Sequence, residues 1–338
     1  MDKKHLKSIF SALLTLLILV GIMALVLRGN VEAIMNSIAS ISAPSLIALL
    51  ALGLGYQLLD SAMCMTLVRS RLPELSYRQV FELTFLGVFG LVTSGGAATI
   101  PMQSGYLYNQ GLDVGNSVGL MIMKYIFHKG TIFLYALIML VTQSGWLGAN
   151  LPSAGKYLAL GFGFCLLIIL ALILICTWDA LRRFALKMIE KLPDSGKWPR
   201  RKVKWSENIG LMYSEARHLA QTKWRMWAML GLNFAKLFVL YCVPYVGARA
   251  VGADVPEFVR MQLLASLMLL LSGVLPNVSG FGSIEIAFLF VFKGFLGEVN
   301  APSVLVLYRI ASYFFPFIIG VIVFMACRKK IVPEKKEA

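Results

Sequence analysis

The sequence predicts an all-α polytopic membrane protein, with about six full transmembrane helices and two broken, re-entrant helical hairpins in inverted-repeat halves. The composition is the first reason, since the 338 residues are 58% hydrophobic and only 14% charged, more apolar than a soluble core of this length needs. The second reason is that apolar runs of spanning length recur along the chain. The third is that two further apolar stretches contain prolines, glycines and polar side chains, which spanning helices facing lipid avoid.

Six apolar segments are long enough to cross a bilayer, because about 20 helical residues span its hydrocarbon core. They are Ile9–Leu27, Ser45–Val68, Val114–Val141, Lys156–Thr177, Trp227–Gly247 and Ala301–Cys327. The first follows three lysines, as the apolar part of a signal peptide would, but its length and the later spans predict an uncleaved helix. The two interrupted stretches are Phe81–Tyr108 and Phe258–Gly297.

Basic residues concentrate in a few hydrophilic segments and divide the chain. The positive-inside rule places these segments and both termini in the cytoplasm of a bacterial-type cell membrane. The expected parts are a first membrane half, a basic amphipathic linker, a second membrane half and a basic tail: 1–177, 178–226, 227–327 and 328–338. Within the linker, apolar residues at helical spacing predict one amphipathic helix over Trp205–Trp227 on the inner leaflet. The linker has no aromatic stacking platform or recognition motif, so nucleic acid is not an expected partner.

The orientation of the spans predicts two inverted halves. Hairpin 81–108 enters from the cytoplasm and hairpin 258–297 enters from outside. Their interruptions are similar, with Ile100-Pro-Met-Gln-Ser-Gly105 in the first and Leu275-Pro-Asn-Val-Ser-Gly280 in the second. Broken apolar segments at corresponding places in inverted halves indicate a transporter's binding site. We therefore expect the two breaks to meet near mid-membrane and to bound one cavity.

The breaks have the residues that an anion site at a helix start needs. Gly280 and Gly282 permit a tight turn, and Ser283 can cap a half-helix with Glu285 in its first turn. Free N–H groups at such a start suit a phosphate. The first break, which includes Ser94, is rich in small and hydroxyl residues. The alternative is that both breaks are only packing turns.

Charged residues inside the apolar segments are the other site candidates, since ionisable groups at membrane depth are costly. Glu285 can pair with a cationic headgroup, position Arg309, or only favour the helix start. Arg309, with Tyr313 on the same helix face, can hold a lipid phosphate, or else extend to the interface. Lys124 and His128 lie one turn apart and suit the same role, with interfacial snorkelling as their alternative.

Two further features of the apolar segments are weaker indications of a binding site. Asn233 and Lys236 can line the cavity or bond between helices. The spacing Gly115-x-x-x-Gly119 predicts a helix-packing face. No nucleophile–base set, carboxylate pair or metal-ligand spacing appears, so we expect no catalytic residue, metal or cofactor.

The residues Leu275-Pro-Asn-Val-Ser-Gly-Phe-Gly-Ser-Ile-Glu285, followed by Leu307-Tyr-Arg309, resemble the lysylphosphatidylglycerol synthase transmembrane family. This is the flippase region of the multiple peptide resistance factor and its stand-alone relatives. In the first half, the stretch Thr93–Tyr108 resembles the other family motif. There, Gln103 stands near the family's acidic position and Tyr106 near its basic one. The resemblance implies lipid transport linked to antimicrobial peptide resistance.

Three functions remain open at this point. The first is a flippase-like lipid translocase for an anionic or aminoacylated phospholipid such as lysylphosphatidylglycerol, or a related phosphate-bearing lipid. The second is the membrane part of, or partner to, a phosphatidylglycerol lysyltransferase. Full-length relatives carry a soluble domain for that reaction, whereas this chain has only a short basic tail, so no enzyme activity is expected. The third is a small-solute secondary transporter. Phospholipid and membrane are the expected partners, and a homo-oligomer is compatible with the sequence.

Overall fold

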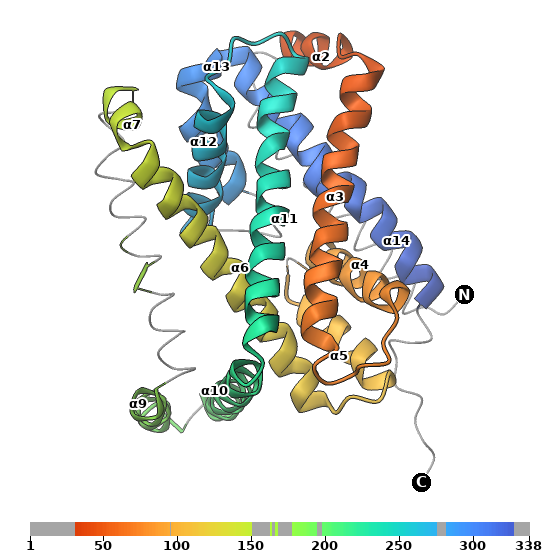
Figure 1. Ribbon diagram of the computed structural model, residues 1–338, viewed down its shortest axis with the longest axis vertical. Helices are drawn as coiled ribbons and strands as arrows, with labels where there is room; N and C mark the ends of the chain where they lie inside the picture. Colours follow the sequence, from red (N-terminus) through yellow and green to blue (C-terminus); the bar gives the residue numbers. More distant parts are fainter. Residues whose placement is uncertain are drawn as a thin grey trace.

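The computed structural model describes residues 31–94, 96–150, 163, 166–167, 178–194, 198–275 and 282–327, and their regular structure is helical throughout (Figure 1). The predicted span Ile9–Leu27, most of Lys156–Thr177, the turn 276–280 and the tail 328–338 lie outside the described residues.

Within the described residues, four helical runs are long and apolar enough to cross a membrane. They are α3 (Ala43–Val68), α6 (Val114–Thr142), α11 (Lys223–Ala250) and the continuous run of α13 (Ser283–Arg309), the π-helix η2 (Ile310–Phe314) and α14 (Phe315–Cys327). The remaining helices are α2 (Val31–Ala39), α4 (Tyr77–Ser94), α5 (Thr99–Asn109), α7 (Ser144–Asn150), α9 (Asp179–Glu190), α10 (Trp198–Ala220) and α12 (Phe258–Ser272). The prediction of an all-helical membrane protein is confirmed.

Side-chain caps fix where two of the long helices begin. Ser42 precedes α3 and its hydroxyl accepts a hydrogen bond from the Ser45 N–H at 3.4 Å. Asp113 precedes α6 and its carboxylate accepts from the Asn116 N–H at 3.0 Å. Each cap satisfies one of the N–H groups that a helix leaves unpaired at its start.

The fourth run is two segments joined at a glycine. Its 45 residues would extend about 67 Å as one straight helix, more than twice the hydrocarbon thickness. Gly297 interrupts it with φ of 81°, a conformation that glycine adopts without strain. The chain therefore returns along 283–296, reverses direction, and runs back through 298–327.

Two helical hairpins lie toward opposite ends of the molecule (Figure 1). Helices α4 and α5 form the first, and α12 with the first part of α13 forms the second. Their bounds are close to the predicted stretches 81–108 and 258–297. The matched motifs differ in structure, however. Residues 100–105 lie inside α5, because Pro101 is tolerated in a first helical turn, whereas Leu275 lies in the bend after α12.

The long helices pack across the two halves in a mirrored way. At the centre, α3 and α11 run side by side (Figure 1). Helix α14, from the second half, packs on α4 of the first hairpin. Conversely, α6 from the first half packs on α12 of the second hairpin. Each hairpin is thus held by the spanning helix of the other half.

Helices α9 and α10 lie at the end of the molecule opposite α2 and α7 (Figure 1). We call the α9–α10 end the basic end. Helix α10 packs on the face that Gly115 and Gly119 leave open: a Cβ atom on Gly119 would lie 2.7 Å from Cγ of Glu215. The prediction of a packing face at this spacing is confirmed. The prediction of a single helix over 205–227 is wrong. Helix α10 ends at Ala220, and α11 starts at Lys223 and runs toward the opposite end of the molecule.

Gly53 makes the closest backbone approach in the core. A Cβ atom on this residue of α3 would overlap the carbonyl oxygen of Ala311, and would lie 2.8 Å from the carbonyl carbon. Ala311 belongs to η2, so Gly53 sets how closely α3 and the last span pack. Small residues permit such approaches between membrane helices.

Replacing Gly53 with Ala is expected to destabilise the protein by at least about 2 kcal/mol, since overpacking against backbone forces helices apart. Thermal unfolding in detergent measures the change. Gly231→Ala in α11 is the matched control, because a Cβ atom there meets nothing within 4 Å, and it should be neutral or stabilising. Equal melting temperatures for the two variants would contradict the predicted contact.

Candidate functional site

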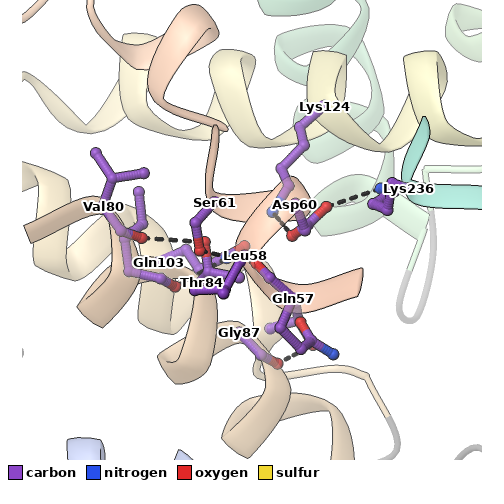
Figure 2. Close-up of polar contacts among 12 residues, drawn as sticks. Gln57, Leu58, Asp60, Ser61, Val80, Thr84, Gly87, Gln103, Lys124 and Lys236 are labelled. Atoms are coloured by element: carbon purple, nitrogen blue, oxygen red, sulfur yellow. Dashed lines mark hydrogen bonds and ion pairs between the residues drawn. The ribbon is translucent and has the colours of Figure 1, made fainter. Parts of the chain in front are cut away.

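A buried ion cluster joins three long helices (Figure 2). The Asp60 carboxylate of α3 binds Lys124 Nζ of α6 at 2.6 Å and Lys236 Nζ of α11 at 2.8 Å. The Lys236 side chain is 1% exposed, and the other two are 13% exposed. We call these three residues the Asp60 triad. Because α3 and α6 precede the basic linker and α11 follows it, the triad is shared by both halves of the chain.

The triad carries one more positive charge than negative charge. A single carboxylate faces two ammonium groups, and an uncompensated cation at membrane depth is costly. The ring of Tyr56 lies 5.4 Å from Lys236 Nζ and compensates only part of that cost. The site is therefore suited to one further negative charge.

Several buried polar groups around these helices have no hydrogen-bond partner within the described part of the chain. They are Nδ1 of His128, both amide atoms of Asn233 and the hydroxyl of Tyr241. His128 is one turn from Lys124, and Asn233 is one turn from Lys236. Buried polar groups in native proteins normally have partners, so unsatisfied ones near a cationic cluster favour a ligand with several acceptor oxygens.

A second buried ion pair ties the second hairpin to the last span. Oε1 of Glu285 accepts from Nε of Arg309 at 2.7 Å and lies 2.6 Å from an Nη atom of Arg309. Its other oxygen accepts from the Gly282 N–H at 2.7 Å. Gly282 has φ of 93°, so the tight turn expected there is present. Both charged residues are 1% exposed.

This second pair is neutral overall and its carboxylate is fully engaged. Glu285 caps the half-helix and holds the guanidinium, which is the positioning alternative that the sequence left open. Arg309 lies at the end of α13, directly before η2, and its guanidinium lies 5.3 Å from the Tyr313 ring. Ser283, the first residue of α13, is also buried. A role of these residues in lipid binding stays a prediction.

The first break is closed by its own hydrogen bonds. Ser94 donates to the Gly90 carbonyl and accepts from the Ala98 N–H, both at 2.6 Å. Gln103 donates to the Leu83 carbonyl at 3.0 Å, so its amide holds α5 against α4. Both predicted site residues, Ser94 and Gln103, therefore have structural roles in the first hairpin.

An acidic partner for the first hairpin comes from α4. Tyr106, which stands near the basic position of the family motif, donates its hydroxyl to Glu82 at 2.6 Å. Arg78 lies 3.5 Å from the same carboxylate. Glu82 therefore supplies a negative charge to the first hairpin, in which Gln103, near the acidic position of the family motif, is uncharged.

The predicted site residues thus fall in three places. Lys124 and His128 lie at the Asp60 triad, and Ser94 and Gln103 lie in the first hairpin. The others surround the second ion pair, apart from Gly280, which lies outside the described residues. A large cavity borders the first break, but residues of α5, α6 and α10 line it together with that break. Residues 276–281 of the second break lie outside the described residues, so the expected lining by both breaks stays a prediction.

Sequence reasoning missed Asp60. Its signal was available, since Asp60 is the one charged residue in the 26-residue helix α3. A carboxylate in such a helix requires a cationic partner, and Lys124 and Lys236 are two of the lysines on the facing spans. Among the described residues, no cluster of three or more histidines, cysteines or acids could hold a metal ion.

The family comparison agrees with this architecture. Residues 12–320 match the family model described as the lysylphosphatidylglycerol synthase TM region. A search of the curated proteins gave no match. The match covers most of the chain, and with the four apolar helices it identifies a multi-pass membrane protein.

Replacing Arg309 with Gln is expected to lower stability by about 3–5 kcal/mol, because the change leaves Glu285 buried without its cation. The double variant Arg309→Gln, Glu285→Gln should recover most of that loss. Folded yield and thermal unfolding of both variants in detergent measure the effect. A double variant as unstable as the single one would show that the two side chains do not depend on each other.

Proposed function

Because the chain belongs to the lysylphosphatidylglycerol synthase TM region family, we propose that it is a flippase-like lipid translocase of the cell membrane. Its substrate is an anionic or aminoacylated phospholipid such as lysylphosphatidylglycerol, or a related phosphate-bearing lipid. The single observation that carries the proposal is the Asp60 triad, a buried cluster with one excess positive charge that both halves of the chain share.

The proposed arrangement in the bilayer has six full spans and two re-entrant hairpins in inverted halves, with both termini in the cytoplasm. Helix lengths support the re-entrant hairpins. Helix α5 has 11 residues and α12 has 15, so they extend about 16 Å and 22 Å, short of a core about 30 Å thick. The mirrored packing of α14 on α4 and of α6 on α12 supports the inverted relation.

The mechanism follows from charge balance. A lipid phosphate that reaches the Asp60 triad supplies the missing negative charge, and its oxygens accept from Lys124 and Lys236. Asn233 and His128 are near enough along their helices to complete the oxygen contacts. Because the cationic helices α6 and α11 belong to different halves, a relative movement of the halves would open the site to one leaflet and then to the other.

The family description names a synthase. This favours an alternative function, in which the chain is the membrane part of, or partner to, a phosphatidylglycerol lysyltransferase. Incubation with lysyl-tRNA and phosphatidylglycerol discriminates the two functions. Formation of the lysylated lipid by the purified chain would support the alternative, whereas movement of lipid without any lysyl transfer supports the translocase.

The test of the proposal is lipid movement in proteoliposomes with fluorescent phospholipids of different headgroups. We expect faster movement for anionic or lysylated lipids than in protein-free vesicles. No acceleration for any phosphate-bearing lipid would contradict the function. Uptake of soluble phosphate into the vesicles, without any lipid movement, would instead favour a small-solute transporter.

Replacing Lys236 with Gln is expected to reduce lipid movement by about tenfold or more, because a charge-assisted hydrogen bond to the phosphate is lost. Folding should persist, since Asp60 and Lys124 remain as a balanced pair. Lys293→Gln is the matched control, because Lys293 is a half-exposed lysine of α13 bound only to the exposed Glu298 in the described contacts. Unchanged transport by a well-folded Lys236 variant would remove the triad from the pathway.

A further inference from the structure

A large groove opens beside the first break, and its lining contains no residue of the Asp60 triad. Its volume is about 1510 Å³, larger than the ~300–1,000 Å³ of a pocket for a drug-sized ligand. The inner end is formed by Gly96, Ala97, Ile100 and Pro101, at the break and the start of α5. One wall is the apolar face of α6, and the other is the first part of α10. The groove thus extends from the basic end of the molecule to the broken turn.

The groove wall on α10 is firmly anchored at one end. Glu215, on the second half of α10, is fully buried against Gly119 and binds Arg71 at 2.9 Å. Leu211 packs beside Gly115 on the same face of α6. The part of α10 that precedes Glu215, from Pro199 to Leu211, supplies residues to the groove lining.

The groove has an apolar interior and a basic rim. Val118 and Ile122 of α6 line the interior with Ile100. Arg200 and Lys204 lie one turn apart on α10, on the same side of the helix, and both line the groove. Glu207 is the carboxylate in the lining, so the charged rim has a net charge of plus one. Large apolar side chains at its mouth, Tyr108, Val114 and Val203, are about half exposed.

We propose that this groove binds one phosphate-bearing phospholipid taken from the adjacent leaflet. Arg200 and Lys204 would hold the phosphate, and the acyl chains would lie along Ile100, Val118 and Ile122. The pattern of a cationic rim above an apolar slot complements an anionic amphiphile and no purely polar solute. The basic end is the end expected in the cytoplasm, so the occupant comes from the cytoplasmic leaflet.

The biological role of the groove rests on the proposed function: the groove would be where a lipid enters the protein before it reaches the Asp60 triad. Part of the groove lining is the break between α4 and α5, where the regular helix is interrupted. A polar headgroup is less costly beside protein backbone than among lipid chains. Binding itself requires no transport. The two proposals can therefore fail independently.

The experiment uses the full chain in nanodiscs with photoactivatable phosphatidylglycerol, and photoactivatable phosphatidylcholine as the zwitterionic comparison. Mass spectrometry of the labelled peptides locates the attachment sites. We expect preferential labelling of α5, α6 and α10 by the anionic probe. Equal labelling by both probes, or labelling of these helices by neither, would overturn the proposal.

Two sets of variants test the rim and the interior. Arg200→Gln with Lys204→Gln should reduce groove labelling by phosphatidylglycerol roughly 30-fold, from two lost interactions of surface-charge strength. Lys187→Gln with Arg201→Gln removes the same residue types from positions that do not line the groove, and should leave labelling within about twofold. An equal loss in both variants would show general attraction to the surface and would overturn the site.

Filling the slot gives a second, independent measurement. Val118→Trp should abolish labelling of α5 with the rim charges intact, whereas Leu137→Trp, on the exposed side of the same helix, should not. The Lys236→Gln protein, in which transport is expected to fail, should label like the unchanged chain. Labelling without any lipid movement would support the groove as a lipid-binding site and would refute the translocase function. Lipid movement without labelling would refute only the groove.

Discussion

An ionised side chain within a bilayer must have a partner that neutralises it, and this constraint determines how the helices of this protein meet. Asp60 draws α6 and α11 to α3 through two lysines. Glu285 draws the last span to the start of the half-helix α13 through Arg309. The two Asp60 contacts join residues 64 and 176 positions apart in the sequence, whereas Glu285 and Arg309 are 24 positions apart, on either side of Gly297. Apolar packing alone gives weak orientation between membrane helices, because lipid chains are equally apolar, so these ion contacts provide direction.

The two clusters differ in balance, and that difference separates structure from candidate function. The Glu285–Arg309 pair has equal charges, and the carboxylate also caps a helix. The net charge of this pair is zero, so the pair does not favour an additional charged ligand. The Asp60 triad has a surplus cation and unsatisfied polar groups nearby. A protein retains such an arrangement at a cost in stability, and a function that uses the surplus is the economical explanation.

The sequence predicted the long apolar helices and the two hairpin stretches, and it singled out Glu285, Arg309 and Lys124 as charged residues in apolar segments, because apolar length and misplaced charge are local signals. It did not predict Asp60 as the partner of Lys124, since pairing depends on which helices are neighbours. Ser94 and Gln103 were chosen for their chemistry, but their hydrogen bonds lie within the hairpin. The division of residues 205–227 between two helices was also missed, since helical spacing continues across the turn. The local sequence pattern predicts secondary-structure elements well, but it predicts contacts between those elements poorly.

The glycine at position 297 has a consequence for how the chain is inserted into the membrane. During synthesis, residues 283–327 present one nearly continuous apolar stretch, and insertion machinery that senses only hydrophobicity has no reason to divide it. In the proposed arrangement, the backbone reversal at Gly297 would make the stretch leave and re-enter the bilayer on one face. A straight helix over the same residues would place its C-terminal end on the opposite face. The proposed sidedness of the C-terminus, and of any reporter fused to it, would then depend on the backbone conformation of one glycine.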